Sequence, residues 1–254
     1  MKHFNLRLYL VTDEACLPPG RDLYDAVEEA LQAGVTLVQY REKNGPGKGM
    51  LEKARKLVAL CHRHSVPLLV NDRLDIALLS GADGVHLGQD DIPVAEARRM
   101  AELFFANSAA AHAANNDAVR TADSAAAHTA NNTLPFTGNR FIIGATAHNV
   151  QEALAAETAG ADYLGCGAVF ATATKKDTVP LGIAGLKAIR QAVHIPIAGI
   201  AGITTENYQQ VLATGADGVA VVSGILGADS IRDTVTRFLR QAHKKQKQKI
   251  QDRA

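Results

Sequence analysis

The fold of this chain is decided by the stretch Gly215-Ala216-Asp217-Gly218-Val219, which has three close counterparts earlier in the sequence. They are Ala33-Gly34-Val35, Gly81-Ala82-Asp83-Gly84-Val85 and Ala159-Gly160-Ala161-Asp162-Tyr163. Glycine at such a position ends a helix in a left-handed cap, and the residues that follow turn the chain into a strand. Four turns of one kind predict a repeated helix-to-strand unit.

Short apolar runs that are rich in β-branched residues indicate parallel strands buried on both faces. We predict strands at 6–11, 35–40, 67–70, 84–87, 141–143, 163–165, 195–199 and 218–221. Helical spacing of apolar residues predicts helices at 22–33, 48–64, 73–80, 93–103, 149–159, 183–193, 204–213 and 229–241. An open doubly wound sheet uses the same turns and is the alternative. Eight such units close most simply as a single (β/α)₈ TIM barrel, an α/β fold that we place at residues 1–242.

Residues 104–140 interrupt this pattern. The segment SAAAHAANN at 108–116 returns as SAAAHTANN at 124–132, and both copies have few large apolar side chains to bury. We interpret 104–140 as a low-complexity insertion between helix 4 and strand 5, partly disordered or loosely helical, and not as a domain. Lysines and glutamines at 243–254 are typical of a solvated basic tail, so we expect no nucleic-acid binding there.

Composition restricts the function classes. The chain has 254 residues and a formal net charge of +1, so no overall positive field attracts nucleic acid or anionic lipid. Cys16, Cys61 and Cys166 form no CxxC pair, and we find neither an export signal nor an apolar run that could span a membrane. We therefore expect a cytoplasmic protein without a membrane partner. Self-association into a homo-oligomer is left open.

Charged residues follow the predicted strands, where the C-terminal ends of barrel strands carry the site. Arg41 and Lys43 come after strand 2, and this pair of cations can hold a diphosphate. A surface salt bridge through Glu42 is an equal alternative. Asp72 follows strand 3 and Asp91 follows strand 4, and two carboxylates beside phosphate-binding cations suit Mg²⁺. Capping of the next helices by these aspartates is the alternative, and it is compatible with metal binding.

The later loops carry small and hydroxyl-bearing residues. Strand 6 leads into Thr172-Ala173-Thr174-Lys175, which suits a loop that closes over a phosphate ligand. Strands 7 and 8 lead into Gly202 and Val222-Ser223, in the loops that form the usual phosphate site of a TIM barrel. The residues therefore predict a site for phosphorylated small molecules.

With these motifs in place, the sequence resembles the thiamine-phosphate synthase family from about Leu8 to Leu239, interrupted only by the insertion. The resemblance rests on Tyr9–Asp13, Gln39–Lys43, Asn71–Arg73, Gly84–Asp91, Gly144–His148, Thr172–Asp177 and Val222–Ser223. It implies a Mg²⁺-dependent transferase that couples a pyrimidine diphosphate to a thiazole phosphate. In the family, diphosphate leaves first and the thiazole nitrogen captures the resulting pyrimidine-methyl cation.

The resemblance also implies roles for individual residues. The pyrimidine diphosphate would be held by Gln39, Tyr40, Arg41, Glu42, Lys43 and Asn71, and Mg²⁺ by Asp72 and Asp91. Thr146 would stand for a family serine as a hydrogen-bond donor. Thiazole phosphate and leaving diphosphate would be contacted by Thr172, Ala173, Thr174, Lys175, Gly202, Val222 and Ser223. Arg41, Lys43 and Lys175 would be catalytic, because they neutralise the leaving group.

Some positions depart from the family pattern. Tyr40 stands where leucine is usual, Ala171 and Ala173 replace prolines or polar residues, and Ala201 replaces a glycine. We expect these changes to alter affinity and not the chemistry. Two other functions are carried as alternatives: a thiazole tautomerase-like barrel, for which His148 could act as acid or base, and a non-catalytic sensor of phosphate ligands.

Overall fold

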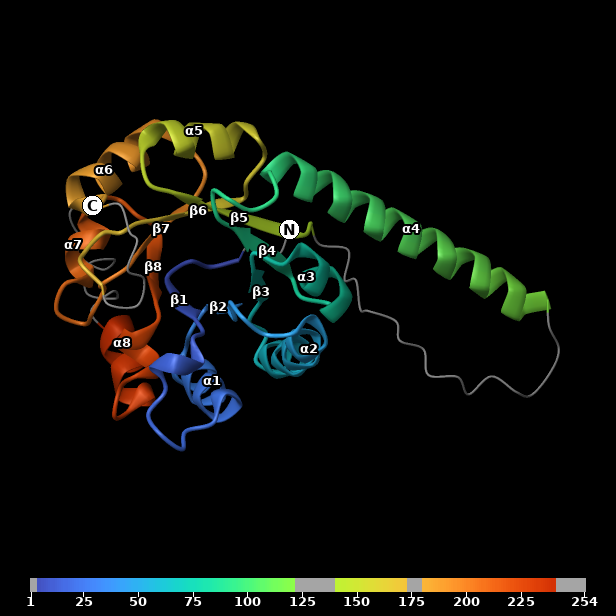
Figure 1. Ribbon diagram of the computed structural model, residues 1–254, viewed down its shortest axis with the longest axis horizontal. Coiled ribbons are helices and arrows are strands. Elements are labelled where there is room, and N and C mark those ends of the chain that lie inside the picture. Colours follow the sequence, from blue (N-terminus) through green and yellow to red (C-terminus); the bar gives the residue numbers. More distant parts are fainter. Residues whose placement is uncertain (1–3, 122–139, 173–179, 241–254) are drawn as a thin grey trace, which may run out of the picture.

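The computed structural model describes residues 4–121, 140–172 and 180–240, with residues 109–121 described by their backbone alone. The described strands form one closed parallel sheet in chain order, with β8 pairing back onto β1 (Figure 1). They are β1 (Leu8–Val11), β2 (Leu37–Tyr40), β3 (Leu68–Asn71), β4 (Gly84–Leu87), β5 (Ile142–Ala147), β6 (Tyr163–Cys166), β7 (Ile197–Ile200) and β8 (Gly218–Val221). The predicted TIM barrel is confirmed, and the open sheet is excluded because no free edge remains.

Helices surround this barrel (Figure 1). They are α1 (Leu23–Ala33), α2 (Gly47–Arg63), α3 (Leu74–Ser80), α4 (Val94–Thr121), α5 (Val150–Thr158), α6 (Gly182–Ala192), α7 (Tyr208–Ala213) and the short α8 (Ser223–Leu226). A 3₁₀ turn, η1, spans Glu14–Cys16, and residues 231–240 are also helical. In the described part of the chain, no helix is both long and apolar enough to cross a membrane.

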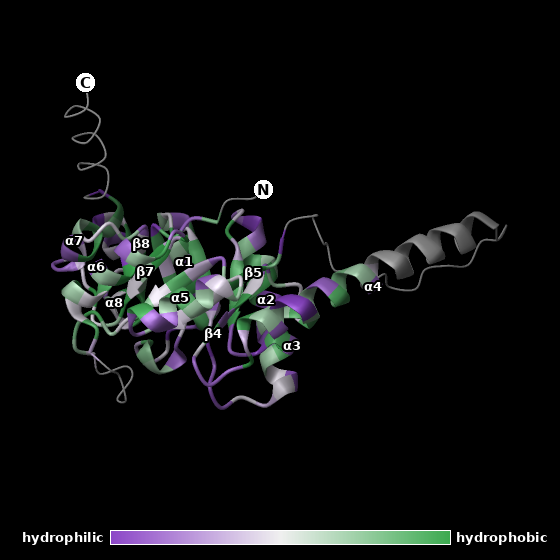
Figure 2. Ribbon diagram, turned by 90° about the horizontal axis from the view of Figure 1, so that it is seen from above, coloured by the Kyte–Doolittle hydropathy of each residue, from purple (hydrophilic) through white to green (hydrophobic). Residues whose placement is uncertain are grey.

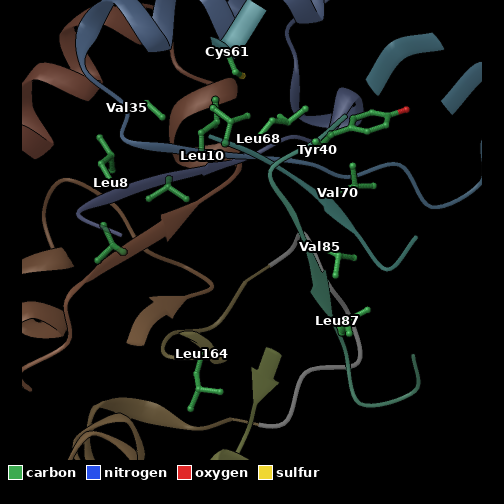
Figure 3. Packing of buried hydrophobic residues seen from close by; sticks show 14 of the residues in the cluster. Leu8, Leu10, Val35, Tyr40, Cys61, Leu68, Val70, Val85, Leu87 and Leu164 are labelled. Atoms are coloured by element: carbon green, nitrogen blue, oxygen red, sulfur yellow. The ribbon is translucent and has the colours of Figure 1, made fainter. Parts of the chain in front are cut away.

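Side chains alternate along each strand between two apolar layers. Leu8 and Leu10 of β1 pack outward in the large cluster between strands and helices, part of which is drawn in Figure 3. Tyr9 and Val11 point the other way, into a smaller cluster that fills the barrel with Leu37, Leu69, Ile142, Tyr163, Ala198 and Ala220. Figure 2 shows the hydrophobic residues concentrated at the strands and the helix faces against them. This alternation decides which polar side chains can reach the inside.

The recurring glycines behave as the sequence predicts. Gly34, Gly81, Gly160 and Gly215 have φ angles of 110°, 77°, 92° and 94°, in the left-handed region that favours glycine. Each of them follows the end of a helix and precedes an even-numbered strand. The four turns are therefore one structural unit repeated around the barrel.

A side chain just before each even-numbered strand ties it to the preceding strand. Its oxygen accepts a hydrogen bond from a backbone N–H near the start of that odd-numbered strand. The four pairs are Thr36 with Leu8 at 3.1 Å, Asp83 with Leu68 at 2.8 Å, Asp162 with Ile143 at 2.8 Å, and Asp217 with Ile197 at 2.9 Å. Repetition of aspartate in the sequence thus reflects a repeated link between neighbouring strands.

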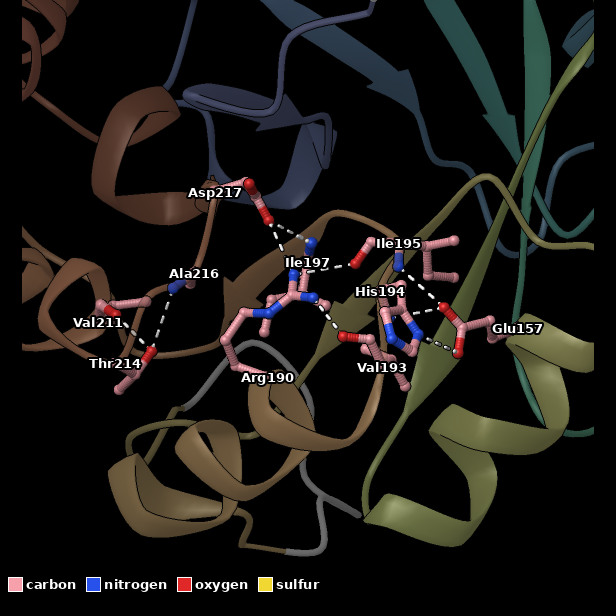
Figure 4. Close-up of polar contacts among 10 residues, drawn as sticks. All are labelled: Glu157, Arg190, Val193, His194, Ile195, Ile197, Val211, Thr214, Ala216 and Asp217. Carbon is pink, nitrogen blue, oxygen red and sulfur yellow. Dashed lines mark hydrogen bonds and ion pairs between the residues drawn. The ribbon is translucent and has the colours of Figure 1, made fainter.

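Basic side chains from the helices complete these links. His62 lies 2.8 Å from Asp83, Arg98 pairs with Asp162, and Arg190 lies 3.2 Å from Asp217. Figure 4 shows the last of these, in which the Arg190 guanidinium also donates to backbone carbonyls of Val193 and Ile195. Each aspartate therefore fixes a strand start and a helix at once.

Helix α4 differs from the prediction. It continues for 28 residues to Thr121, whereas the sequence predicts an end at residue 103. Alanine is the strongest helix former and no glycine or proline interrupts this stretch, so the predicted insertion begins as a continuation of α4. Figure 1 shows α4 extending well beyond the barrel. The rest of the insertion and the basic tail at 243–254 lie outside the described residues.

Candidate active site

A cavity of about 450 Å³ opens at the C-terminal ends of the strands. Its wall is built from residues at the ends of all eight strands or in the loops that follow them. The predicted site residues that line it are Gln39, Arg41, Lys43, Asn71, Asp72, Asp91, Thr146, Thr172, Gly202, Val222 and Ser223. The structure therefore brings residues from seven different strands and the loops after them to one place.

Two predicted residues do not line the cavity. Tyr40 follows Gln39 in β2, so it points to the opposite face, where it is 1% exposed in the core between strands and helices. Its hydroxyl donates to Glu42 Oε2, and Glu42 also accepts a hydrogen bond from Lys53 Nζ at 3.1 Å. Tyr40 and Glu42 are therefore absent from the cavity wall, and their contact with substrate stays a prediction. Ala173, Thr174 and Lys175 lie outside the described residues.

The two cations after β2 are held by carboxylates of neighbouring strands. Arg41 Nη1 lies 2.6 Å from Asp13 Oδ2, and Lys43 Nζ lies 2.7 Å from Asp72 Oδ2. Glu42 forms its ion pair with Lys53 instead, so the alternative of a salt bridge from Glu42 to these cations is wrong. Both cations are partly exposed at the cavity, where a polyanion could exchange with the carboxylates.

The two predicted metal ligands are neighbours. Burial and the nearby Asp72 carboxylate raise the pKa of Asp91, while a backbone N–H from Gly88, 2.6 Å from Asp91 Oδ2, opposes this. Asp72 has a φ of 63°, an uncommon conformation for a residue other than glycine. It does not cap α3, whose N-cap residue is Arg73. Two adjacent carboxylates, of which Asp91 has a raised pKa, form a place where a cation is electrostatically favoured.

A charge count of the wall tests whether Mg²⁺ suits it. In the described part of the wall, Asp72, Asp90 and Asp91 oppose Arg41 and Lys43, so carboxylates outnumber cations. A diphosphate would be repelled by such a surplus unless a further cation joined it. Mg²⁺ typically binds one or two carboxylates and completes its shell with water and substrate phosphate oxygens. The residues present therefore fit a magnesium ion bound with its phosphate ligand.

The loops after β7 and β8 form the opposite wall. Gly202 has a φ of 63°, and a side chain there would meet Ala171 O at 2.4 Å. Ala201 precedes it with a φ of 80°, so the residue that departs from the family glycine occupies a backbone conformation that favours glycine. The α8 helix begins within this wall, at Ser223. These loops supply a small, close-fitting surface of the kind that accommodates phosphate.

Several lining residues were missed by the sequence analysis as site residues. They are chiefly Tyr9, His86, Gln89, Asp90 and His148. Gln89 donates to the backbone carbonyl of Thr146, and His148 Nδ1 lies 2.9 Å from Glu152 Oε2. Tyr9 and His86 could have been identified from strand alternation, because they lie in register with inward-facing neighbours. Cys166, in contrast, is fully buried with its pKa raised to about 12 by burial, as suits a packing residue.

Comparisons with known proteins show the family of this chain. A family model described as thiamine monophosphate synthase matches residues 8–133 and 107–225, and the overlap falls in the predicted insertion. The chain is 41% identical to a thiamine-phosphate synthase of Clostridium acetobutylicum, over 92% of this chain and 93% of that protein. It is 45% identical to one of Chloroflexus aurantiacus, over 89% and 87%. A solved thiamine phosphate pyrophosphorylase from Pyrococcus furiosus is similar with a TM-score of 0.74 and 33% identity, covering 94% and 96%.

Proposed function

This chain belongs to the thiamine-phosphate synthase family and is an enzyme, a transferase, and from that premise we propose the details of its reaction. It joins a pyrimidine diphosphate to a thiazole phosphate and releases diphosphate and thiamine phosphate. The observation that carries this proposal is the meeting of Arg41, Lys43, Asp72 and Asp91 in one cavity. These groups suit a diphosphate and its metal ion, and the reaction needs both to be held.

The proposed binding roles follow the two walls of the cavity. Gln39 and Asn71 hold the aminopyrimidine, while Arg41 and Lys43 leave their carboxylate partners to bind its diphosphate. Asp72 and Asp91 would hold Mg²⁺, which supplies charge neutralisation for the diphosphate oxygens when bound. Gly202, Val222 and Ser223, with Thr172, accept the thiazole phosphate on the other side. Two anions are thereby kept at separate ends of one cavity.

The proposed chemistry is dissociative. The bond between the pyrimidine methylene carbon and the diphosphate breaks first, and its electron pair leaves with the diphosphate oxygen. Arg41, Lys43 and, by family resemblance, Lys175 neutralise that departing group. The thiazole nitrogen then donates its electron pair to the methylene carbon. No protein nucleophile takes part, which agrees with the neutral, buried state of Cys166.

A coupled assay tests the proposal. Purified protein is given pyrimidine diphosphate, thiazole phosphate and Mg²⁺, and the release of diphosphate is followed together with thiamine phosphate. We expect equal amounts of both products. Conversion of the thiazole phosphate isomer without diphosphate release would indicate the tautomerase alternative, in which His148 would act. Binding of both ligands without any turnover would indicate the sensor.

Substitutions of single charged residues test the residue assignment. Asp72→Ala should lose turnover by about 100-fold or more, because the metal and Lys43 both lose their partner. Asp75→Ala is the matched control, since Asp75 lies three residues further, pairs with Arg73 and does not line the cavity. Lys175→Ala should also lose most turnover. Unchanged turnover in Asp72→Ala would remove the proposed metal site.

A further inference from the structure

A chain of hydrogen bonds crosses the inside of the barrel beneath the cavity. Gln39 Nε2 donates to the Tyr9 hydroxyl, and the Tyr9 and Tyr163 hydroxyl oxygens lie 2.8 Å apart. The Tyr163 hydroxyl lies 2.8 Å from His86 Nδ1, and His86 Nε2 lies 3.0 Å from Thr146 Oγ1. Five residues from five strands thus form one path, and all of them except Tyr163 line the cavity.

This path is enclosed by the barrel. Gln39, Tyr9, Tyr163 and His86 are all less than 9% exposed. The glycine at 144 leaves room for the Tyr163 ring, because a side chain there would meet the phenol at 2.2 Å. The glycine at 165 does the same for His86, whose Cε1 would lie 2.9 Å away. The Tyr163 and His86 rings of the path are therefore held in place by the sequence of the strands around them.

Every member of the path is neutral. Burial raises the pKa values of Tyr9 and Tyr163 above their usual range, and the His86 ring is enclosed among these groups at 8% exposure, where charge is disfavoured. A neutral imidazole has one N–H donor and one acceptor nitrogen, and each phenol has one proton to donate. The direction of the hydrogen bond at one end therefore determines the direction of all the others.

Gln39 sets that direction. An amide nitrogen only donates, so the Tyr9 oxygen accepts and its proton turns to Tyr163. Tyr163 then donates to His86 Nδ1, and the ring proton of His86 stays on Nε2, from which it is donated to Thr146 Oγ1. With its oxygen already accepting, the Thr146 hydroxyl has its own proton left to donate to a ligand in the cavity.

We propose that this path makes His86, Tyr163 and Tyr9 positioning residues, which hold the Thr146 hydroxyl as a hydrogen-bond donor toward an acceptor atom of the substrate. The path works through the Thr146 hydroxyl at one end, while Gln39 at the other end is proposed to hold the aminopyrimidine. It deepens the proposed function and rests on it for the identity of the substrate, while the direction of the path is a property of the protein alone.

The direction can be measured without any substrate. Protein labelled on the histidine ring nitrogens is studied by NMR, and the His86 signals are assigned by their absence from His86→Gln. We expect the proton on Nε2 and none on Nδ1. A proton on Nδ1 would mean that the path runs from Thr146 toward Gln39, which would overturn the proposal even if the protein makes thiamine phosphate. Conversely, a protein without coupling activity but with the Nε2 proton would contradict the proposed function alone.

A kinetic experiment tests the consequence for Thr146. Tyr163→Phe removes the donor to His86 Nδ1 and leaves the wall of the cavity intact, because Tyr163 does not line it. We expect a mixture of both His86 tautomers and a decrease of kcat/KM of about tenfold, the equivalent of one hydrogen bond. Tyr208→Phe is the matched control, since it also removes a buried phenol oxygen, but in the helical layer against Phe238.

Comparison with the control decides the outcome. Both variants are assayed well below their unfolding temperatures, and Tyr208→Phe should keep the wild-type tautomer and kcat/KM. Equal kinetics in the two variants, together with an unchanged His86 tautomer in Tyr163→Phe, would reject the positioning role. If Tyr163→Phe does not fold, Tyr9→Phe breaks the same path one residue earlier, and its result is taken from the His86 tautomer alone because Tyr9 itself lines the cavity.

Discussion

Ala201 illustrates how a single residue reports on the site. Its φ of 80° lies in the left-handed region, which costs an L-residue roughly 1–2 kcal/mol relative to glycine. It also lines the cavity beside Gly202, on the wall that we assign to a phosphate. The protein thus tolerates local backbone strain next to its ligand, as functional sites often do.

Ala201→Gly should stabilise the protein by about 0.5–1 kcal/mol, because relief of the strain exceeds the extra backbone entropy of glycine in the unfolded chain. Denaturant unfolding measures the change. Ala198→Gly, at a fully buried position without a positive φ in β7, the strand before Ala201, should instead destabilise the protein. The interpretation of Ala201 as strained would be wrong if both variants changed stability in the same direction.

His86 predicts a dependence of stability on pH. Burial holds its pKa at about 4 in the folded protein, below the ordinary value of 6.5 that applies when the chain unfolds. Between these values the unfolded chain binds a proton that the folded protein does not, so stability falls as the pH decreases from about 6.5 to about 4. The total loss from this group is roughly 3 kcal/mol.

Unfolding free energies measured across this range test the role of His86. The decrease should be about 3 kcal/mol smaller in His86→Gln than in the wild type. His194→Gln should show the wild-type decrease, because the His194 side chain is 97% exposed. A decrease in His86→Gln as steep as in the wild type would show that other groups cause it.

For single residues, the sequence predicted which residue types belong to the site better than it predicted the face of the strand to which each side chain points. Arg41, Lys43, Asp72 and Asp91 could be selected because charged groups after barrel strands have few other reasons to be there. The placement of Tyr40 and Glu42 away from the cavity was missed. The run 39–43 was treated as one motif, although successive side chains along a strand point to opposite faces.

At the scale of elements, the links before the even-numbered strands show what the repeated turns do. Asp162 accepts from the Ile143 backbone N–H and pairs with Arg98 of α4, and these two side chains are only 16% and 13% exposed. Arg98 also donates to the backbone carbonyls of Phe141 and Gly160. One guanidinium therefore attaches α4 to two strands.

Arg98→Ala should destabilise the protein by about 2–4 kcal/mol, because a mostly buried carboxylate loses its nearest cation and two backbone carbonyls lose the hydrogen bonds that Arg98 donates. Arg99→Ala is the control on the same helix. Its ion pair with Glu96 is largely exposed, and its loss should cost less than about 0.5 kcal/mol. Thermal or denaturant unfolding distinguishes them, and similar losses in both variants would contradict this account of Asp162.

The elements also show where prediction from the sequence ends. Glycine caps were predictable because their signal is local: the residue itself has the required backbone freedom. The length of α4 could not be predicted. An alanine-rich stretch without glycine or proline contains no residue that marks where the helix ends and an insertion begins. The partners of the aspartates were also missed, since they depend on which strands become neighbours.

On the scale of the whole molecule, closure of the barrel makes the two ends of the chain depend on each other. β1 pairs with β2 on one side and with β8 on the other, with Leu10 opposite Val221. The cavity likewise combines Gln39 and Arg41 with Val222 and Ser223. No shorter segment of the chain contains the whole sheet or all the residues of the site.

A truncated chain tests this dependence. Protein that ends at residue 217 lacks β8, so β1 and β7 would both become open edges, and we expect no cooperative unfolding transition by circular dichroism. Protein that ends at residue 240 keeps every described strand and helix and should unfold cooperatively. A cooperative transition in the shorter chain would show that a partial barrel is stable on its own.

The pairing of β1 with β8 also matters while the protein is being made. The first strand leaves the ribosome long before the last one has been translated, and until then one side of it has no neighbour. Exposed strand edges attract other chains, so the nascent protein passes through a prolonged period of vulnerability to aggregation that ends only when its final strand emerges.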